Sequence, residues 1–312
     1  MTKPRNPRKS SELGITLPAT SANLGPAFDA AALALSLFLR VRAKPAKEFS
    51  IVARGVDTEI CGQMKNHLIL ETYRDLLQRE RKRIVPLSLR LDNEIPIGKG
   101  CGSSAAARLA GIVLANYYAR LGWNGDRIMA EAARREGHLD NAAACWLGGL
   151  AVGRVSSQCE VHSVRILPKG KWPLLLAIPE EMLPTEQARS ILPKLYSRAD
   201  AVINIQNSML LAAAFIQGRK ELLAAALEDR VHQPYRAQLC PLLPALQQLS
   251  GKHGILGVAL SGAGPSVLIF VDPKAELRQI KQPVRTQLAA HGLGATLIDT
   301  TVTPRGASQS VR

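Results

Sequence analysis

The sequence has few aromatic side chains, and its few cysteines are scattered. Phe, Trp and Tyr make up 4% of its 312 residues, which argues against a surface that stacks nucleic-acid bases on aromatic rings. Its five cysteines show no C-x-x-C spacing, and their number is odd. This pattern argues against a disulfide framework or a zinc site, and it favours a reducing compartment.

Acidic residues are also scarce relative to basic ones. The chain has 25 Asp and Glu against 40 Lys and Arg, which gives a formal net charge of +15. Much of the excess lies in the first nine residues and in R-E-R-K-R at 79–83, so a solvated basic surface and a disordered tail over 1–12 are expected. The charge suits anionic ligands such as nucleotides. A nucleic-acid-associated protein is the alternative, but no recognisable module supports it, and we expect no specific nucleic-acid partner.

Long apolar runs are missing. No apolar segment follows the basic N-terminus, so no signal peptide is predicted. The longest uncharged apolar stretch, 253–271, is interrupted by four glycines and a proline, which predicts strand, turn and strand in place of a membrane span. We therefore expect a cytoplasmic protein with no membrane association.

The most informative stretch is P-I-G-K-G-C-G-S-S-A-A at 96–106, which leads into an Ala-rich apolar run. Glycines let the backbone take positive φ and approach a ligand closely, and a glycine-rich turn that opens a helix presents free N–H groups to an anion. The stretch is not a Walker A loop, because Gly100 follows Lys99, and it lacks the G-x-G-x-x-G spacing. A tight turn with only a connecting role remains the alternative.

Apolar periodicity predicts interleaved strands and helices, hence a mixed α and β class. Strands are expected at 15–20, 33–41, 48–53, 87–95, 150–155, 161–167, 174–178, 255–260, 266–271 and 295–302. Helices are expected at 66–81, 103–120, 127–135, 141–146, 199–226, 242–249 and 277–290. A polar, Gly/Pro-punctuated loop is expected over Thr20–Asp29. The charged, Gly/Pro-bounded stretch 169–173 is a plausible domain joint, so we predict domains at 13–168 and 169–312.

Three separated motifs carry a family resemblance. They are L-P-A-T-S-A-N-L-G-P-A-F-D at 17–29, P-I-G-K-G-C-G-S-S-A-A at 96–106 and S-G-A-G-P-S-V-L at 261–268. In residue type, order and spacing the chain resembles the GHMP kinases, from about residue 15 to 302.

Four local signatures make the chain most similar to the homoserine kinases within that superfamily. They are S-A-N-L-G-P followed by F-D at 21–29, E-G-H-L-D-N at 136–141 with L-G-G at 147–149, L-P-T with A-R and L-P at 183–193, and H-Q-P-Y-R at 232–236.

The resemblance implies an α/β (α+β two-layer) GHMP kinase fold, with a ribosomal protein S5 domain 2-like N-terminal domain and a ferredoxin-like C-terminal domain around an active-site cleft. It implies an enzyme that uses ATP and Mg²⁺ to convert L-homoserine to O-phospho-L-homoserine, a step toward threonine. Family members are often dimers, so a homodimer is also expected.

The resemblance also implies roles for individual residues. ATP would contact Asn66, Pro96, Ile97, Gly98, Lys99, Gly100, Cys101, Gly102, Ser103, Ser104, Ala105, Ala106, Gly262 and Gly264. Magnesium would be held by Ser104 and Glu136. The amino-acid substrate would contact Asn23, Asp29, His138, Asp140, Asn141, Thr185, Arg189 and Arg236, of which Asn23, Asp29 and Asn141 are also the catalytic candidates.

The chemistry of these residues agrees with the implied roles. Arginines such as Arg189 and Arg236 suit a carboxylate, because guanidinium can bind it in a bidentate way. Where mevalonate kinase-like members carry an aspartate that can act as a base, this chain has Asn141, so we expect phosphoryl transfer without a dedicated base. Capping or structural roles remain the alternative for each polar residue.

The sequence departs from the family pattern in three places. Ala27 replaces a usual glycine, and would strain the chain if that position needs positive φ. Cys101 replaces a usual leucine, and the segment after His138 lacks the family's prolines. The alternatives are therefore a GHMP kinase for another small alcohol, such as L-threonine or an isoprenoid precursor, and a non-catalytic nucleotide-binding relative.

Overall fold

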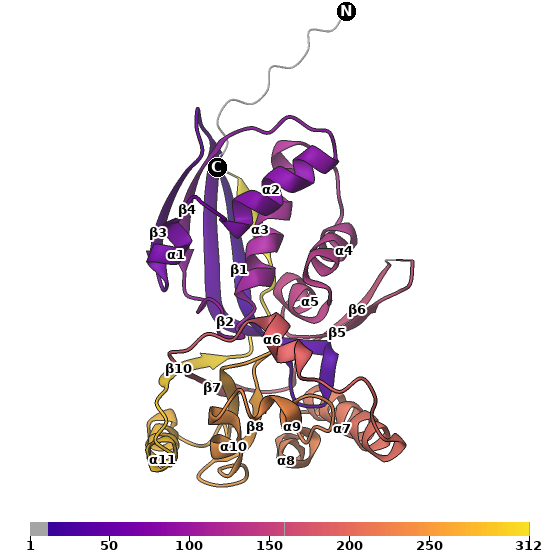
Figure 1. Ribbon diagram of the computed structural model, residues 1–312, viewed down its shortest axis with the longest axis vertical. Helices are drawn as coiled ribbons and strands as arrows, with labels where there is room; N and C mark the ends of the chain where they lie inside the picture. The colour runs from indigo at the N-terminus through magenta and orange to yellow at the C-terminus, as the bar shows by residue number, and fades with distance from the viewer. Residues whose placement is uncertain (1–11, 159, 312) are drawn as a thin grey trace, which may run out of the picture.

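A computed structural model describes residues 12–158 and 160–311, arranged around two β-sheets (Figure 1). The upper part of the molecule holds a seven-stranded sheet, and the lower part holds a four-stranded sheet. The predicted mixed α and β architecture is confirmed. The predicted tail falls outside the described residues except for Glu12.

The seven-stranded sheet is built mainly from the first half of the chain. Its order is β11-β1-β2-β4-β3, and β5 pairs with both β2 and β6. Every pairing is antiparallel except that of β3 with β4. The strands are β1 (Leu13–Asn23), β2 (Ala27–Pro45), β3 (Ser50–Gly55), β4 (Leu87–Asn93), β5 (Leu150–Val155), β6 (Val161–Ile166) and β11 (Ser308–Val311).

Helices cover one face of this sheet (Figure 1). They are α2 (Leu68–Arg79), α3 (Ser103–Tyr118), α4 (Gly125–Glu136) and α5 (Asp140–Leu147), with the short α1 (Thr58–Gly62) beside β3. Gly111 lets α2 and α3 approach closely, because a Cβ there would lie 2.6 Å from the Ile69 carbonyl oxygen. This contact fixes α3, whose N-terminus follows the glycine-rich stretch.

The second sheet has the order β10-β7-β9-β8 and is antiparallel throughout. Its strands are β7 (Pro173–Ile178), β8 (Ile255–Leu260), β9 (Val267–Val271) and β10 (Thr296–Thr301). The associated helices are α6 (Thr185–Ser190), α7 (Arg198–Gln217), η1 (Lys220–Leu222), α8 (Leu223–Ala226), α9 (Gln233–Arg236), α10 (Leu242–Gln247) and α11 (Leu277–Ala290).

The domain boundary near 168 stays a prediction. The gap between β6 and β7 falls at that point, but the chain end returns to the first sheet, where β11 pairs with β1. Among the described residues, α7 is the one helix whose length and mean hydropathy of 1.3 would allow it to cross a bilayer. Its Leu211, Ala214 and Phe215 are buried in the molecule.

Some local predictions are wrong. The loop expected over Thr20–Asp29 is a hairpin in which β1 runs to Asn23, β2 starts at Ala27, and only 24–26 form the turn. Positive φ falls on Asn23, Leu24, Gly25 and Asp29, and Ala27 is free of that strain. The helix expected over 199–226 breaks after Gln217, because Gly218 takes a left-handed conformation. The short elements α1, α6, α9 and β11 were not predicted.

Candidate active site

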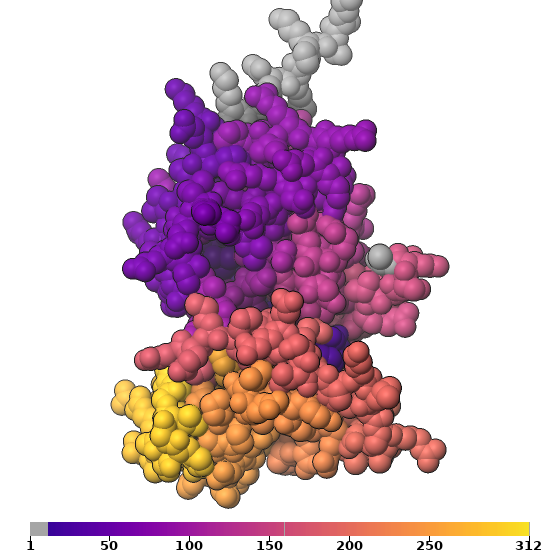
Figure 2. All heavy atoms as spheres, in the orientation of Figure 1, coloured from indigo at the N-terminus to yellow at the C-terminus, as the bar shows by residue number. Residues whose placement is uncertain are grey.

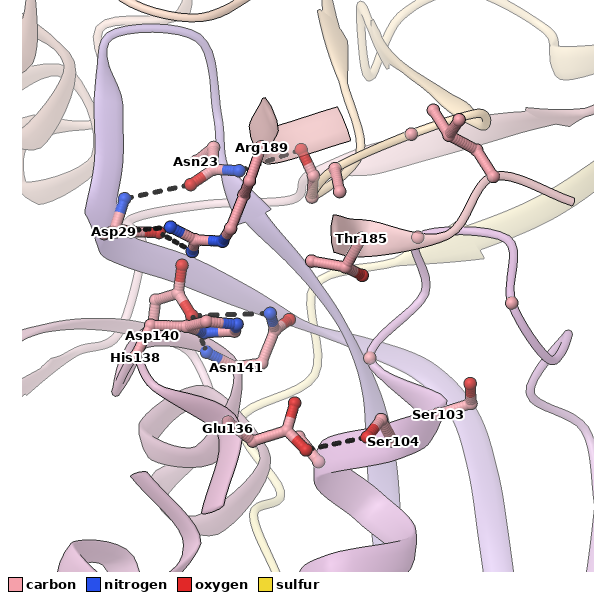
Figure 3. A pocket seen from close by; sticks show the side chains of 18 of the residues that line it. Asn23, Asp29, Ser103, Ser104, Glu136, His138, Asp140, Asn141, Thr185 and Arg189 are labelled. Carbon is pink, nitrogen blue, oxygen red and sulfur yellow. Dashed lines mark hydrogen bonds and ion pairs between the residues drawn. The ribbon is translucent and has the colours of Figure 1, made fainter. Parts of the chain in front are cut away.

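One cavity collects most of the residues that the motifs single out (Figure 3). It has a volume of about 280 Å³ and lies between elements of the two sheets. The predicted residues that line it are Asn23, Asp29, Gly98, Gly100, Gly102, Ser103, Ser104, Ala105, Glu136, His138, Asp140, Asn141, Thr185, Arg189, Arg236, Gly262 and Gly264.

The glycine-rich stretch adopts the backbone that its sequence predicts. Gly98, Gly100 and Gly102 have φ of 69°, 77° and 70°, where a side chain would be strained. A side chain at position 100 is also excluded by lack of space, because its Cβ would lie 2.2 Å from the carbonyl oxygen of Ser261. The Ser261 hydroxyl donates to the Gly100 carbonyl at 2.8 Å. The turn is thus held against the β8–β9 loop.

A second, mostly apolar pocket of about 330 Å³ adjoins the cavity. Gly98, Ser103 and Ser104 line both spaces. The pocket also contains the predicted Asn66 and Ile97. His67 at its edge has a lowered pKa because of burial, and its neutral ring contacts the Cys61 carbonyl through Nε2 at 3.1 Å. The pair of spaces offers an apolar slot next to a polar, glycine-lined cavity.

Ser104 and Glu136 face each other across the cavity floor. The Ser104 hydroxyl donates to Glu136 Oε1 at 2.7 Å, as Figure 3 shows. The Arg108 guanidinium contacts the same carboxylate oxygen. Hydroxyl and carboxylate oxygens are hard donors of the kind that Mg²⁺ prefers, so these two residues fit a magnesium site.

Two pairs of a basic and an acidic side chain lie on the opposite side of the cavity. Arg189 from α6 binds Asp29 of β2 in a bidentate way, with N–O distances of 2.6 and 3.0 Å. His138 contacts Asp140 at 2.7 Å. Burial alone would lower the pKa of His138, but the hydrogen bond and charge of Asp140 raise it above its ordinary value. One atom each of Asp29, His138 and Asp140 lies within 4.8 Å of the others, but these groups already have partners.

Arg236 differs from Arg189, because it is buried without a counter-ion. Its side chain is 1% exposed, and it donates to the carbonyls of Ala188 (2.9 Å) and Gly262 (3.3 Å). Burial, and then repulsion by Arg189, lower the pKa of Arg236 to about 10. In the part of the chain that the structure describes, no carboxylate forms an ion pair with it. A guanidinium of this kind can pair with an anion that enters the cavity.

His232, one helical turn before Arg236, helps to hold the Arg236 guanidinium in place. Burial lowers the pKa of His232 to about 4, so the ring is neutral. Its Nε2 lies 2.8 Å from the Gly25 carbonyl, and its Nδ1 lies 3.2 Å from Arg236 Nη1. Nε2 therefore donates to Gly25, and Nδ1 accepts from the guanidinium. The H-Q-P-Y-R signature thus links Arg236 to the β1–β2 turn.

The two asparagines of the site are also tied down. Asn23 donates to the Gly262 carbonyl at 2.8 Å and accepts from the Asp29 N–H at 2.9 Å. Asn141 Oδ1 accepts from the Thr20 hydroxyl at 2.6 Å. These bonds orient both amides at the junction of β1, α5 and the β8–β9 loop.

Four residues of the predicted nucleotide site line neither space: Pro96, Lys99, Cys101 and Ala106. Cys101 and Ala106 are buried, and burial raises the pKa of Cys101 to about 12. The Lys99 ammonium donates to the carbonyls of Pro179 (3.1 Å), Glu181 (2.8 Å) and Glu180, in the segment between β7 and α6. It joins the glycine turn to the segment that leads into Thr185 and Arg189.

The cavity also contains residues that the sequence reasoning missed, namely Arg108, Arg135, Leu183 and Ala263. Arg108 could have been found, because it lies four residues after Ser104 and therefore on the same face of α3. Leu183 and Ala263 stand within quoted motifs but were not predicted as site residues, and Arg135 carried no local signal.

Family models match segments in both halves of the chain. Residues 67–149 match the family model of the GHMP kinases N terminal domain, and residues 211–290 match that of the GHMP kinases C terminal domain. The chain belongs to the GHMP kinase family. This GHMP kinase is 46% identical over 261 residues to a homoserine kinase of Solibacter usitatus, covering 83% of this chain and 84% of that protein. It is 38% identical to a homoserine kinase of Desulfitobacterium hafniense, covering 94% and 98%.

Solved structures give the same result for the fold. A protein of Listeria monocytogenes, provisionally described as a homoserine kinase, superposes with a TM-score of 0.75 at 30% identity, covering 96% of this chain and 99% of that one. Homoserine kinase of Cytophaga hutchinsonii superposes with a TM-score of 0.80, covering 99% and 100%. At 22% identity that second likeness concerns the fold alone.

The position of Lys99 leads to a prediction. Replacing Lys99 with Met removes the ammonium that holds the 179–181 carbonyls, and loosens the segment that carries Thr185 and Arg189. We expect the KM for the acceptor substrate to rise about 3- to 10-fold, corresponding to about 0.5–1.5 kcal/mol, with little change in ADP affinity. Steady-state kinetics and ADP titration check this. A large loss of ADP affinity with an unchanged acceptor KM would show that Lys99 acts on the phosphates instead.

Proposed function

We propose that this protein phosphorylates L-homoserine with ATP, giving ADP and O-phospho-L-homoserine, in the cytoplasm and on the route to threonine. The observation that carries the proposal is Arg236, a buried guanidinium that faces the cavity without a counter-ion. A small acceptor that brings its own carboxylate relieves this unpaired charge. A sugar or another neutral alcohol does not.

The charges around Arg236 suit an α-amino acid. The substrate carboxylate would bind Arg236 and reach Arg189, whose guanidinium is already in the cavity. The ammonium group would bind Asp29 or Asp140. The Asp29–Arg189 pair offers one negative and one positive group 2.6 Å apart, which matches a zwitterion more closely than a simple acid. The hydroxyl on the far end of homoserine would then extend toward the glycine turn.

The nucleotide would occupy the glycine-lined side and the adjoining pocket. The apolar pocket beside Asn66 and Ile97 suits adenine, and the N–H groups after Gly98 suit the phosphates. Because Ser103 and Ser104 line both spaces, the triphosphate would pass over the N-terminus of α3. The terminal phosphate would therefore lie near the substrate hydroxyl.

Magnesium would be held by Ser104 and Glu136. When bound, it would neutralise phosphate charge. The Arg108 guanidinium contacts the same Glu136 oxygen as Ser104, so it would compete with the cation for that oxygen. Arg108 also lines the cavity and would add positive charge near the phosphates.

The reaction needs no dedicated base in this site. The homoserine oxygen attacks the terminal phosphorus, the bond to the ADP oxygen breaks, and the hydroxyl proton passes to the transferred phosphate. Asn141 cannot take a proton at neutral pH, and its Oδ1 already accepts from Thr20. Positioning and charge neutralisation would supply most of the rate, since the transition state of phosphoryl transfer is commonly loose.

The main test is homoserine-dependent ADP release, measured across L-homoserine, L-threonine, mevalonate, galactose and 3-amino-1-propanol. The last compound is homoserine without its carboxylate. We expect L-homoserine to be preferred. We expect Arg236→Met to raise its KM about 10- to 100-fold, which corresponds to about 1.5–3 kcal/mol for a hydrogen bond to a charged group. Turnover of 3-amino-1-propanol should change little, because it lacks the group that Arg236 binds.

Arg219→Met is the matched control, because Arg219 is an exposed arginine outside the cavity. It should leave both substrates unaffected. No ADP release with L-homoserine from folded protein would reject the proposed function. Equal losses on both acceptors in Arg236→Met would reject the role of that residue alone.

Glu136→Gln tests the magnesium site. We expect the Mg²⁺ concentration for half-maximal rate to rise at least about 10-fold, because a metal-binding carboxylate is lost. Arg108→Met should shift the Mg²⁺ requirement downward, since it removes the cation that competes for Glu136. Binding of Mn²⁺ in the presence of ADP, followed by electron paramagnetic resonance, gives a second measurement that does not depend on turnover. Unchanged metal binding in both variants would exclude this site.

Asn141→Ala tests the absence of a base. Loss of a general base commonly costs about 10²- to 10⁴-fold in rate, so we expect a decrease in kcat of about 10-fold or less. Calorimetric binding of ADP and homoserine serves as the control for an intact site. If both ligands bind normally and turnover disappears, Asn141 has more than a positioning role.

A further inference from the structure

The last turn of α4 carries a guanidinium that is not among the predicted site residues. Arg135 lines the cavity, directly before Glu136 and three residues before His138. Its side chain is 9% exposed. In Figure 2 the pink surface that includes α4 and α5 meets the salmon surface that includes α6, so this part of the chain lies where the upper and lower parts of the molecule meet.

Two carboxylates hold Arg135 in one position. Its Nε donates to Glu131 Oε1 at 2.6 Å, and its Nη2 donates to Asp75 Oδ2 at 2.5 Å. Within residues 12–158 and 160–311, Nη1 has neither a hydrogen bond nor an ion pair. Because a guanidinium is planar, bonds at Nε and Nη2 also fix the direction of Nη1.

Glu131 is the centre of this arrangement. It is buried, and Arg79, Arg134 and Arg135 all donate to its carboxylate. Burial alone would raise the pKa of Glu131, but the hydrogen bonds from the three arginines lower it to about 2. The carboxylate is therefore ionised at neutral pH, and it holds three guanidiniums at once.

The charge of Arg135 is only partly neutralised by these contacts. Its buried counter-ion, Glu131, is shared with two other arginines. Its second counter-ion, Asp75, has a side chain that is 61% exposed, so water and salt screen that charge. Arg135 can therefore attract a further anion from the cavity, and its Nη1 is free to donate to it.

We propose that Arg135 binds the terminal phosphate of the nucleotide, and that Glu131 is the residue that positions it. This inference rests on the proposed function, because it needs a triphosphate over the N-terminus of α3. Arg135 stands beside Glu136, which would hold magnesium, and α4 leads directly into the acceptor-side residues 138–141. The phosphate between the metal and the acceptor is the terminal one.

Arg135 differs from Arg108 in its relation to the metal. Arg108 contacts the same Glu136 oxygen as Ser104, so it would compete with magnesium. Arg135 is held by other carboxylates, so it and the cation can act on the same phosphate together. Charge on the oxygens of the transferred group persists through phosphoryl transfer, and a guanidinium fixed in advance can stabilise it.

Nucleotide binding tests this inference without the acceptor. Calorimetric titration with AMP, ADP and the non-hydrolysable ATP analogue AMPPNP, with Mg²⁺ present, shows which phosphate is contacted. Arg135→Met should weaken AMPPNP binding about 10- to 100-fold, the range for a hydrogen bond to a charged group, and should change ADP and AMP binding less than about 3-fold. Because no acceptor is present, the result does not depend on whether L-homoserine is phosphorylated.

Arg134→Met is the matched control. Arg134 also donates to Glu131 and lies in the same helical turn, but its side chain is 54% exposed and does not line the cavity. We expect this variant to bind AMPPNP as the wild type does. Equal losses in both variants would overturn the proposal, as would unchanged AMPPNP binding in Arg135→Met or equal losses of AMPPNP and ADP.

Glu131→Gln tests the positioning role. It keeps the size of the side chain but removes the charge, so Arg135 should lose its fixed orientation. We expect the ratio of AMPPNP to ADP affinity to fall about 3- to 10-fold, whereas a general loosening of α4 would weaken both nucleotides alike. An unchanged ratio would overturn the role of Glu131.

A second variant at position 135 covers the case in which Arg135→Met does not fold. Arg135→Lys keeps the charge but loses the planar fork. It should lower AMPPNP affinity about 3- to 10-fold with ADP affinity retained. Circular dichroism checks the fold of each variant, and unchanged AMPPNP affinity in a folded Arg135→Lys would contradict a bond that needs the guanidinium.

Discussion

The unpaired guanidinium of Arg236 is the interaction on which the rest of the site depends. A buried cation without a counter-ion costs several kcal/mol, and carbonyl oxygens recover only part of that cost. The chain therefore surrounds Arg236 with fixed acceptors, the carbonyls of Ala188 and Gly262, and with a neutral His232 that adds no second charge. A bound carboxylate would offset the remaining cost, so an anionic ligand would stabilise the folded protein as well as fill the cavity.

The site is assembled from segments that belong to different sheets, and a few contacts hold these segments in register. Ser261 bonds the glycine turn to the β8–β9 loop, and Lys99 bonds it to the segment before α6. Asp29 and Arg189 join β2 to α6 directly. Each contact joins two segments that carry residues lining the cavity. Displacement of any one of them would change the distance between the two ligands.

The sequence predicted the parts of the site whose chemistry is local. The positive φ values of Gly98, Gly100 and Gly102 follow from a glycine-rich turn before an apolar helix, and the structure confirms them. It could not predict Lys99 bonding to carbonyls eighty residues away, nor the Asp29–Arg189 pair, because no periodicity reports a contact between distant segments. The loop expected over Thr20–Asp29 was wrong for a related reason: Asn23 and Asp29 line the cavity from strands, so their polarity reflects the site and not a turn.

The charged side chains of the cavity form ion pairs, with one exception. Arg189 has Asp29, His138 has Asp140 and Arg108 has Glu136, whereas Arg236 has only neutral partners. A zwitterion adds no net charge to the cavity. Its ammonium group would bind Asp29 and its carboxylate would bind Arg189, so replacing the Asp29–Arg189 ion pair would have little electrostatic cost. The same carboxylate would also reach Arg236. A triphosphate would add several negative charges, and Arg108, Arg135 and a bound cation would offset part of them. On the proposed assignment the two ligands would use separate charges, and this separation would let them occupy one cavity together.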